Sequence, residues 1–238
     1  MSALGRWRVG RQHWRDLLFL HWPVPPEVVR PLVPAPLEID TLEGQAYVTL
    51  IPFAITGSRP ARFPRALSMS FLETNLRTYV RLPGGTPGIF FFSLEASSLA
   101  AVLGARAFYG LPYFAATMAR KKEGDRIVYS SRRRVASGPD GAAALDVAWR
   151  VGPLVGSASP GTRQHFLVER YVLYVERRRR IYSARVRHQP YPLYHASLER
   201  LSQSLLTAAG LPAPVVEPLV QHSSGVDVDI FWLQRARE

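Results

Sequence analysis

The sequence predicts a mainly β (α+β) fold, in which an antiparallel β-barrel or sandwich carries two or three peripheral helices. About ten segments of the 238-residue chain have the length and composition of strands. Twenty prolines punctuate the chain from end to end, as expected where many short strands are joined by turns. Strands and helices do not alternate regularly, which argues against a doubly wound parallel sheet.

The expected strands are β-rich or alternating segments bounded by turn residues. The fourth is expected to form a hairpin with the third, and the turn at residues 121–125 to join the fifth to the sixth. In chain order the strands are residues 14–21, 46–53, 71–81, 88–95, 113–120, 126–135, 143–151, 166–175, 181–188 and 226–232.

Three segments are expected to be helical. Residues 25–32 open with prolines, which a first helical turn tolerates. Ser97 or Ser98 can cap a helix that ends no later than Gly110. Residues 197–209 place leucines at helical spacing, which predicts an amphipathic helix.

The charge balance is strongly basic, with 30 Lys and Arg against 18 Asp and Glu, and the only lysines are Lys121 and Lys122. Arginine runs at 132–134 and 177–180 admit a nucleic-acid partner, but arginine is spread along the whole chain, so a generic basic surface is the simpler interpretation. The chain has no cysteine, which excludes disulfides and thiol chemistry. No signal peptide or segment of roughly 20 apolar residues is visible, so we expect a cytoplasmic protein without a membrane span.

Segment 71–81, FLETNLRTYVR, separates two kinds of side chain. Successive side chains of a strand point to opposite faces. One face therefore carries the polar row Glu73, Asn75, Arg77, Tyr79 and Arg81, and the other carries smaller or apolar residues. If the row faces water, this is an ordinary half-buried strand. If it faces a concave interior, it forms the polar wall of a small-molecule site.

Several segments together resemble a known family. In order they are WRDLLFLHWPVPPEVVRPLVP, LEGQAYVTLIPF, FLETNLRTYVR, GARAFYGLPYF, FLVERYVLY and HSSGVDVDI. This ordered set resembles the uncharacterised YqjF-like family of the acetoacetate decarboxylase-like superfamily. The resemblance implies one domain over residues 1–238, with its core at about 14–232. It also implies a closed, cone-like antiparallel β-barrel around a small-molecule pocket, with the Glu73 row facing inward.

The resemblance also implies a Schiff-base lysine just after a turn that contains glycine and proline, beside a second lysine that lowers its pKa. The matching turn is 110–112, and Tyr113 and Phe114 follow it. Neither side chain can form an imine. Lys121 and Lys122 lie in an expected hairpin turn, where a solvated lysine keeps its ordinary pKa. Decarboxylation through an imine is therefore not expected.

Arg77 is the best candidate for a ligand anchor, because a guanidinium can bind a carboxylate or enolate in a bidentate manner. Glu73 is the candidate general acid or base, with a pKa raised by burial. Glu169 is expected inside, paired with Arg77, and Phe90 or Phe92 is expected to add aromatic lining. The further candidate ligand-binding residues are Asn75, Tyr79, Tyr109, Tyr113, Phe114 and Glu169.

Other chemistry has little support. The six histidines show no metal-ligand spacing, and His21 fits a core or interface residue better. Nucleotide-binding loops and nucleophile elbows are missing, and no cofactor is expected. The sequence leaves three functions open: a small-molecule enzyme or binder acting on a carboxylated or carbonyl compound, a non-catalytic ligand-binding or interaction protein, and a nucleic-acid binder. A homo-oligomer also stays open.

Overall fold

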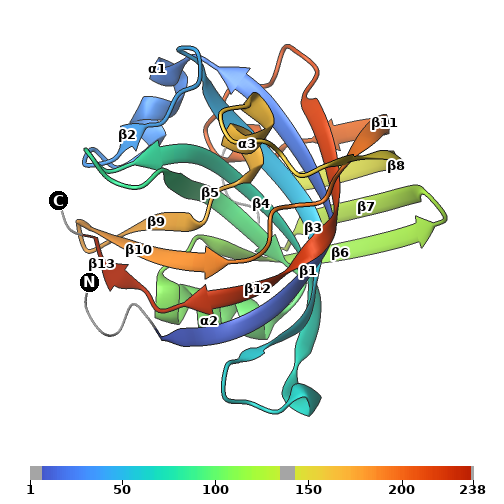
Figure 1. Ribbon diagram of the computed structural model, residues 1–238, viewed down its shortest axis with the longest axis horizontal. Helices are drawn as coiled ribbons and strands as arrows, with labels where there is room; N and C mark the ends of the chain where they lie inside the picture. The colour runs from blue at the N-terminus through green and yellow to red at the C-terminus, as the bar shows by residue number, and fades with distance from the viewer. Residues whose placement is uncertain (1–6, 135–142, 237–238) are drawn as a thin grey trace.

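A computed structural model describes residues 7–134 and 143–236 of the chain. Within these residues thirteen strands form one sheet, and short helices lie around it (Figure 1). The predicted end of a strand at Val135 lies outside the described residues. None of the described helices combines the length and the apolar character that crossing a lipid bilayer would require.

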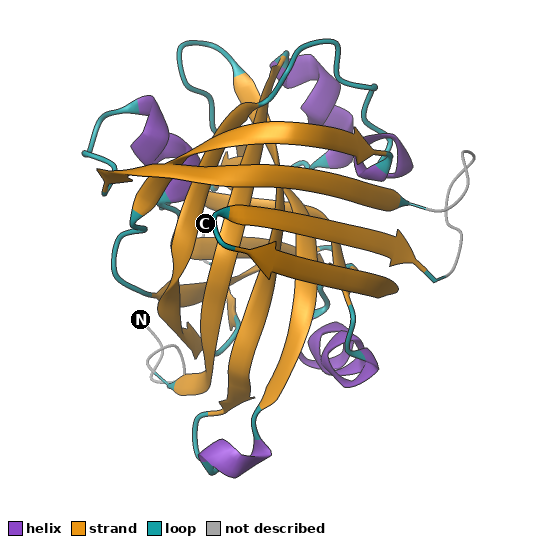
Figure 2. Cartoon of the chain, turned by 90° about the vertical axis from the view of Figure 1, so that its right-hand side faces the viewer, coloured by secondary structure: helices purple, strands orange, loops and turns teal. Residues whose placement is uncertain are grey.

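The strands are β1 (Arg8–Val24), β2 (Glu38–Ile39), β3 (Ala46–Pro60), β4 (Met69–Arg81), β5 (Gly88–Ala96), β6 (Tyr113–Glu123), β7 (Arg126–Arg133), β8 (Ala144–Gly156), β9 (Val172–Arg177), β10 (Arg180–Arg187), β11 (Leu193–Gln203), β12 (Leu219–Phe231) and β13 (Gln234–Arg235). The helices are α1 (Pro26–Val29), α2 (Leu99–Tyr109), α3 (Arg163–Val168) and α4 (Leu205–Ala208), with 3-10 turns η2 (Arg30–Leu32) and η3 (Arg65–Leu67). Figure 2 shows the helices at the periphery of the strands.

The strand pairings close the sheet into two rings that share β12, β1, β3, β4 and β5. The first ring, here called the seven-stranded ring, is completed by β9 and β10, because β10 pairs with β12 and β9 pairs with β5. The second, the packed ring, is completed by β6, β7, β8 and β11. The prediction of a closed, mainly β fold with peripheral helices is therefore confirmed. Pairing is antiparallel except where β5 meets β6 and β9, which run parallel to it.

Each ring has its own apolar interior, and side chains alternate between the two along the shared strands. On β4, Leu76 and Val80 belong to the cluster inside the packed ring. Phe71 and Tyr79, on the opposite face, belong to the cluster inside the seven-stranded ring. The shared strands therefore have little solvent-facing surface, and polar residues placed on them must find partners inside the protein.

Helix α2 follows the sequence signals closely. The Ser98 side chain accepts a hydrogen bond from the Ala101 N–H at 3.3 Å and caps the first turn. Gly110 ends the helix with φ +67, a left-handed conformation that glycine adopts without steric cost.

The predicted helix at 197–209 is wrong. Residues 193–203 form β11, and only Leu205–Ala208 is helical. A register shift between Leu198 and Arg200 where β11 meets β8 inserts an extra residue. Leu198 and Leu201 can then both pack against the interior of the packed ring although they are three residues apart. A bulged strand therefore imitates helical spacing.

The predicted strand at 166–175 is wrong in its first half. The chain forms α3 (Arg163–Val168) before β9 (Val172–Arg177). The Thr162 side chain caps this helix by accepting a hydrogen bond from the His165 N–H at 3.2 Å.

Gly225 lies on β12 against the backbone of β1. It has φ +129, and a Cβ added there would lie 2.0 Å from the Trp14 carbonyl oxygen. Gly225→Ala should lower the free energy of unfolding by more than about 2 kcal/mol, because backbone strain and a backbone clash combine. Gly84→Ala is the control: φ is +64, but an added Cβ meets nothing within 4 Å. Equal losses in urea unfolding of the two variants would contradict this account.

Candidate functional site

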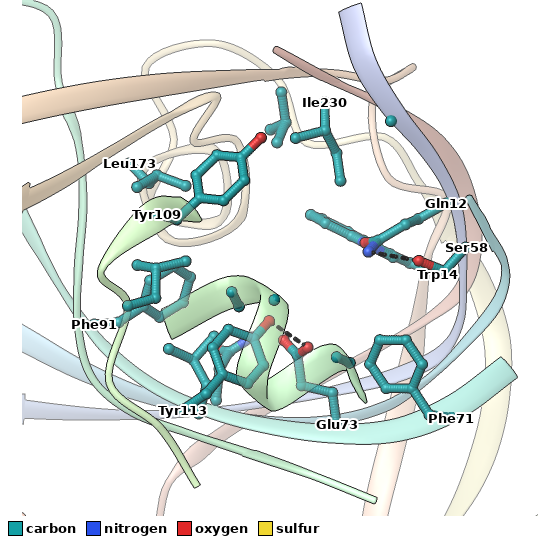
Figure 3. Close-up of a pocket in the computed structure, with 18 of the residues that line it drawn as sticks. Gln12, Trp14, Ser58, Phe71, Glu73, Phe91, Tyr109, Tyr113, Leu173 and Ile230 are labelled. Carbon is teal, nitrogen blue, oxygen red and sulfur yellow. Dashed lines mark hydrogen bonds between the residues drawn. The ribbon is translucent and has the colours of Figure 1, made fainter. Parts of the chain in front are cut away.

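The seven-stranded ring encloses a cavity of about 510 Å³. Side chains from β1, β3, β4, β5, β9, β10 and β12 line it, and α2 lies along one side. Figure 3 shows Tyr109, Phe91, Tyr113, Phe71, Trp14 and Ile230 around the open space. Most of the lining is apolar or aromatic, and a small polar group lies on β4, as is usual for small-molecule pockets.

The polar row of β4 faces this cavity over three residues. Glu73, Asn75 and Arg77 line the cavity and are buried. Tyr79 is fully buried beyond its end, and Arg81 is exposed and pairs with Glu38 at 3.1 Å. The inward orientation expected for the row therefore holds from 73 to 77.

Glu73 forms the best-defined polar contact in the cavity. The Tyr113 hydroxyl donates a hydrogen bond to Oε2 of Glu73 at 2.7 Å (Figure 3). Burial raises the pKa of Glu73 from 4.5 to about 7, although hydrogen bonds from Tyr113 and Asn75 act in the opposite direction. Burial also raises the pKa of Tyr113 well above 10, so this hydroxyl stays protonated and remains a donor.

Arg77 is a buried cation with incomplete pairing. Its Nη2 donates to the Leu167 carbonyl oxygen at 3.2 Å, but its Nε has no hydrogen-bond partner. The Tyr79 hydroxyl donates to the same carbonyl at 2.7 Å, so the C-terminal turn of α3 positions both side chains. Among residues 7–134 and 143–236, no carboxylate forms an ion pair with Arg77.

Two further polar groups add to this arrangement. Asn75 lies between Glu73 and Arg77 on the row, and its Oδ1 is buried without a hydrogen-bond partner. Arg170 also lines the cavity and pairs with Asp40 at 2.8 Å. Arg170 is paired with its acid, whereas Arg77 is buried in the cavity wall without a carboxylate partner in the described chain.

Several predicted site residues lie elsewhere. Glu169 does not pair with Arg77: it accepts hydrogen bonds from the Tyr191 N–H at 2.9 Å and from the Tyr171 hydroxyl. Phe114 is not part of the lining and stacks under the Arg133 guanidinium at 3.7 Å. Tyr109 does line the cavity, and its hydroxyl donates to the Phe231 carbonyl oxygen at 3.4 Å.

The expected aromatic lining by Phe90 or Phe92 is also corrected. A register shift lies between the Leu76–Ser93 and Arg77–Phe91 pairs of β4 and β5. The shift puts Phe91, rather than its neighbours, opposite Arg77 and into the cavity lining. The sequence contains no signal for this bulge.

A second polar chain of the cavity lining, on β1 and β3, was not predicted from the sequence. Trp14 Nε1 donates to Gln12 Oε1 at 2.8 Å, and Gln12 Nε2 donates to Ser58 Oγ at 3.2 Å (Figure 3). Gln12 precedes the predicted start of its strand, and Ser58 follows the predicted end of its own, so both were outside the segments considered. Gln12 and Trp14 are two residues apart, so period-2 alternation would have placed both side chains on the same face of the strand.

The two lysines lie away from the cavity lining. Lys121 pairs with Glu123 at 2.7 Å, and Lys122 pairs with Asp16 at 2.8 Å. His21 is completely buried, as expected of a core histidine, and burial followed by the charge of Arg77 lowers its pKa to about 3. In the described part of the chain, no three His, Cys, Asp or Glu side chains come close enough to hold a metal ion.

The arginine runs are partly used inside the fold. Arg133 is buried against Glu95, and Arg132 pairs with Asp146. Arg177 donates to the carbonyl oxygen of Phe108 at 3.1 Å. These three arginines are therefore already bound to groups of the protein itself. A nucleic-acid partner stays an untested prediction.

Residues 11–227 match the model of DUF2071, a family described as uncharacterized conserved protein. The chain belongs to this family. It is 41% identical over 229 residues to the uncharacterized protein YqjF of Bacillus subtilis (strain 168), an alignment that covers 96% of this chain and 92% of YqjF. The YqjF-like resemblance seen in the sequence is thereby confirmed.

Solved structures show the same fold at low identity. The enduracididine biosynthesis enzyme MppR complexed with pyruvate superposes with a TM-score of 0.65 at 12% identity, over 96% of this chain and 91% of MppR. Acetoacetate decarboxylase from Legionella pneumophila superposes with a TM-score of 0.64 at 14% identity, over 96% of this chain and 87% of that enzyme. The fold is therefore acetoacetate decarboxylase-like.

Glu73 should make stability depend on pH. The unfolded chain releases this proton near pH 4.5, whereas the native carboxyl holds it to about pH 7. The free energy of unfolding should therefore fall as pH rises between these values, by roughly 3 kcal/mol from this group. Glu73→Gln keeps an acceptor for Tyr113 but cannot ionise, so the difference in unfolding free energy between the two proteins should change by this amount over the same range. Parallel pH profiles in urea unfolding would show that Glu73 titrates normally.

Proposed function

We propose that this protein binds a small carboxylated or carbonyl compound in the cavity and acts on it without a Schiff-base lysine. Arg77 binds the carboxylate or enolate of the ligand, and Asn75 lies beside Arg77 on the same face of β4. Glu73 and Tyr113 exchange or hold a proton beside the carbonyl. The observation that carries this proposal is the buried guanidinium of Arg77, which lines the cavity, has a buried Nε without a hydrogen-bond partner and has no carboxylate partner among the described residues.

The energetic argument concerns the empty and the occupied protein. A buried charge without a partner destabilises the protein, and removing one partner of a buried pair typically costs about 3–5 kcal/mol. A carboxylate from a ligand would supply the missing partner and could meet the planar guanidinium with two hydrogen bonds. The unpaired charge lowers the stability of the unliganded protein, and its pairing with a ligand contributes to the affinity. Such a trade-off between stability and function is common at functional sites.

The proton chemistry follows from Glu73. A pKa of about 7 leaves this carboxyl partly protonated at neutral pH, which is the condition in which one group can both accept and deliver a proton. The Tyr113 hydroxyl occupies one of the positions that follow the 110–112 turn and donates to Glu73. Proton transfer next to a ligand carbonyl is therefore the reaction type that these side chains support.

The comparisons support the ligand class. The structurally similar MppR was solved in complex with pyruvate, a small 2-oxo acid that carries both a carboxylate and a carbonyl. A non-catalytic ligand-binding protein is the alternative. An enzyme would turn over a bound oxo acid, and a non-catalytic binder would not. The loss of an NMR signal of the substrate with time measures this turnover.

Arg77→Met should abolish binding of pyruvate, because the substitution keeps the length of the side chain and removes its charge. Calorimetric titration of the wild type with pyruvate should show binding, and the variant should show at least a hundredfold weaker binding, from the loss of roughly 3 kcal/mol. The unliganded variant should be as stable as the wild type or more stable, since an unpaired buried charge has been removed.

Arg81→Met is the matched control, because Arg81 belongs to the same strand and the same side-chain row but is exposed. It should bind pyruvate like the wild type. A wild type that does not bind, or an Arg77→Met protein that binds normally, would contradict the proposal. An Arg77→Met protein that no longer folds would show that the residue is structural.

Borohydride reduction should leave no covalent adduct when the protein is incubated with pyruvate or acetoacetate. Both lysines pair with acids away from the cavity, so neither reaches a bound carbonyl. Intact-protein mass spectrometry reads the result, with an acetoacetate decarboxylase as the positive control. A trapped adduct that disappears in the Lys121→Ala, Lys122→Ala double variant would overturn this assignment.

A further inference from the structure

The cavity is far more apolar at one end than a small oxo acid requires. Its polar wall, Glu73, Asn75 and Arg77, is buried at 4–6% exposure. Other lining side chains reach solvent and therefore mark the mouth: Leu67 is 60% exposed, and Phe108 is 63% exposed. The buried polar groups of β4 thus lie inside, and large apolar side chains lie at the opening together with Arg11 and Arg59, which also line the cavity.

The rim of the mouth is apolar on several elements. Met69 at the start of β4 and Trp232 after β12 also line the cavity and remain 42% and 39% exposed. Exposing large apolar side chains costs free energy, and contiguous apolar patches usually mark a binding surface. A compact polar substrate would gain nothing from these apolar side chains.

Helix α2 also has features that suit an apolar ligand. Its first two turns line the cavity with small residues, Ala100, Ala101, Gly104 and Ala105, and the aromatic residues Phe108 and Tyr109 follow only in its last turn. Leu99 and Leu103, in contrast, have more than half of their surface exposed. An ordinary peripheral helix buries its large apolar residues and exposes the others. The small residues leave open volume: a Cβ added to Gly104 would meet nothing within 4 Å.

The volume points to the same class of ligand. The cavity of about 510 Å³ falls within the range of roughly 300–1,000 Å³ that is usual for pockets holding drug-sized molecules. Pyruvate has only six heavy atoms, so an acid of that size bound at Arg77 would leave most of this space, including the apolar stretch along α2, without contacts.

We propose that the ligand is an amphiphilic acid, with an oxo-acid head at Arg77 and Glu73 and an extended apolar chain that runs along α2 to the mouth. This inference rests on the proposed function for the position of the head group. The chain contacts Phe91 and Leu173 within the ring and the small residues of α2 beside them. Chain length, rather than the head group alone, then determines affinity.

Calorimetric titration with unbranched 2-oxo acids, from pyruvate to 2-oxodecanoate, tests this inference. Affinity should rise about fourfold with each added methylene until the chain fills the cavity, because each buried methylene contributes a constant transfer free energy. Ala105→Leu should narrow the apolar stretch. It should leave pyruvate affinity within twofold of the wild type and reduce 2-oxooctanoate affinity at least tenfold.

Ala107→Leu is the matched control, because Ala107 is an exposed alanine of the same helix and does not line the cavity. Its affinity for each 2-oxo acid of the series should equal that of the wild type. Gly104→Leu serves as a second narrowing variant, so that the test survives if Ala105→Leu fails to fold.

The outcomes separate the two proposals. If pyruvate binds through Arg77 but affinity does not rise with chain length, the amphiphilic ligand is wrong and the proposed function stands. If affinity rises with chain length but Arg77→Met binds equally well, the carboxylate anchor is wrong and the apolar stretch stands. If no acid of the series binds, both are wrong.

Discussion

Strand β4 has almost no solvent-facing surface, because it is shared by the two rings and each of its faces looks into an interior. The polar side chains on its inner row must therefore be satisfied inside the protein. Tyr113 satisfies Glu73, and the Leu167 carbonyl satisfies Tyr79 and one nitrogen of Arg77. What remains is the buried guanidinium of Arg77, which lines the cavity and whose Nε has no hydrogen-bond partner. The proposed function depends on this unpaired charge.

Much of this could be predicted from the sequence because it follows from period-2 alternation. Alternation along residues 71–81 correctly put Glu73, Asn75 and Arg77 on one face, and turn and capping residues correctly placed α2. Bulges defeat the same reasoning, because each inserts one residue and inverts the pattern beyond it. This is why Phe91 rather than Phe92 lines the cavity, and why β11 looked like a helix.

Pairing between distant segments could not be predicted at all. Glu169 was assigned to Arg77 on grounds of charge, but the fold supplies a backbone N–H and a tyrosine hydroxyl instead. Its neighbour Arg170 reaches the cavity and is neutralised by Asp40. Which acid meets which base depends on the register of whole strands, and no local pattern encodes that register.

The family resemblance implies a lysine in the segment where this chain has Tyr113, and the proposed function therefore uses no imine. A hydroxyl that donates to a carboxyl of pKa about 7 favours proton transfer over covalent catalysis. Fold and reaction are thus independent properties, and the site must be argued from its own side chains. The tyrosine and the small residues of α2 together describe a cavity for a larger ligand that is held by charge at its inner end.

A crystal structure of the protein with bound 2-oxooctanoate tests the central claim most directly. The account predicts that the carboxylate of the acid lies within hydrogen-bonding distance of the Arg77 guanidinium and that the alkyl chain lies along α2. An acid bound away from Arg77, or an Arg77 side chain paired with a carboxylate of the protein itself, would contradict it.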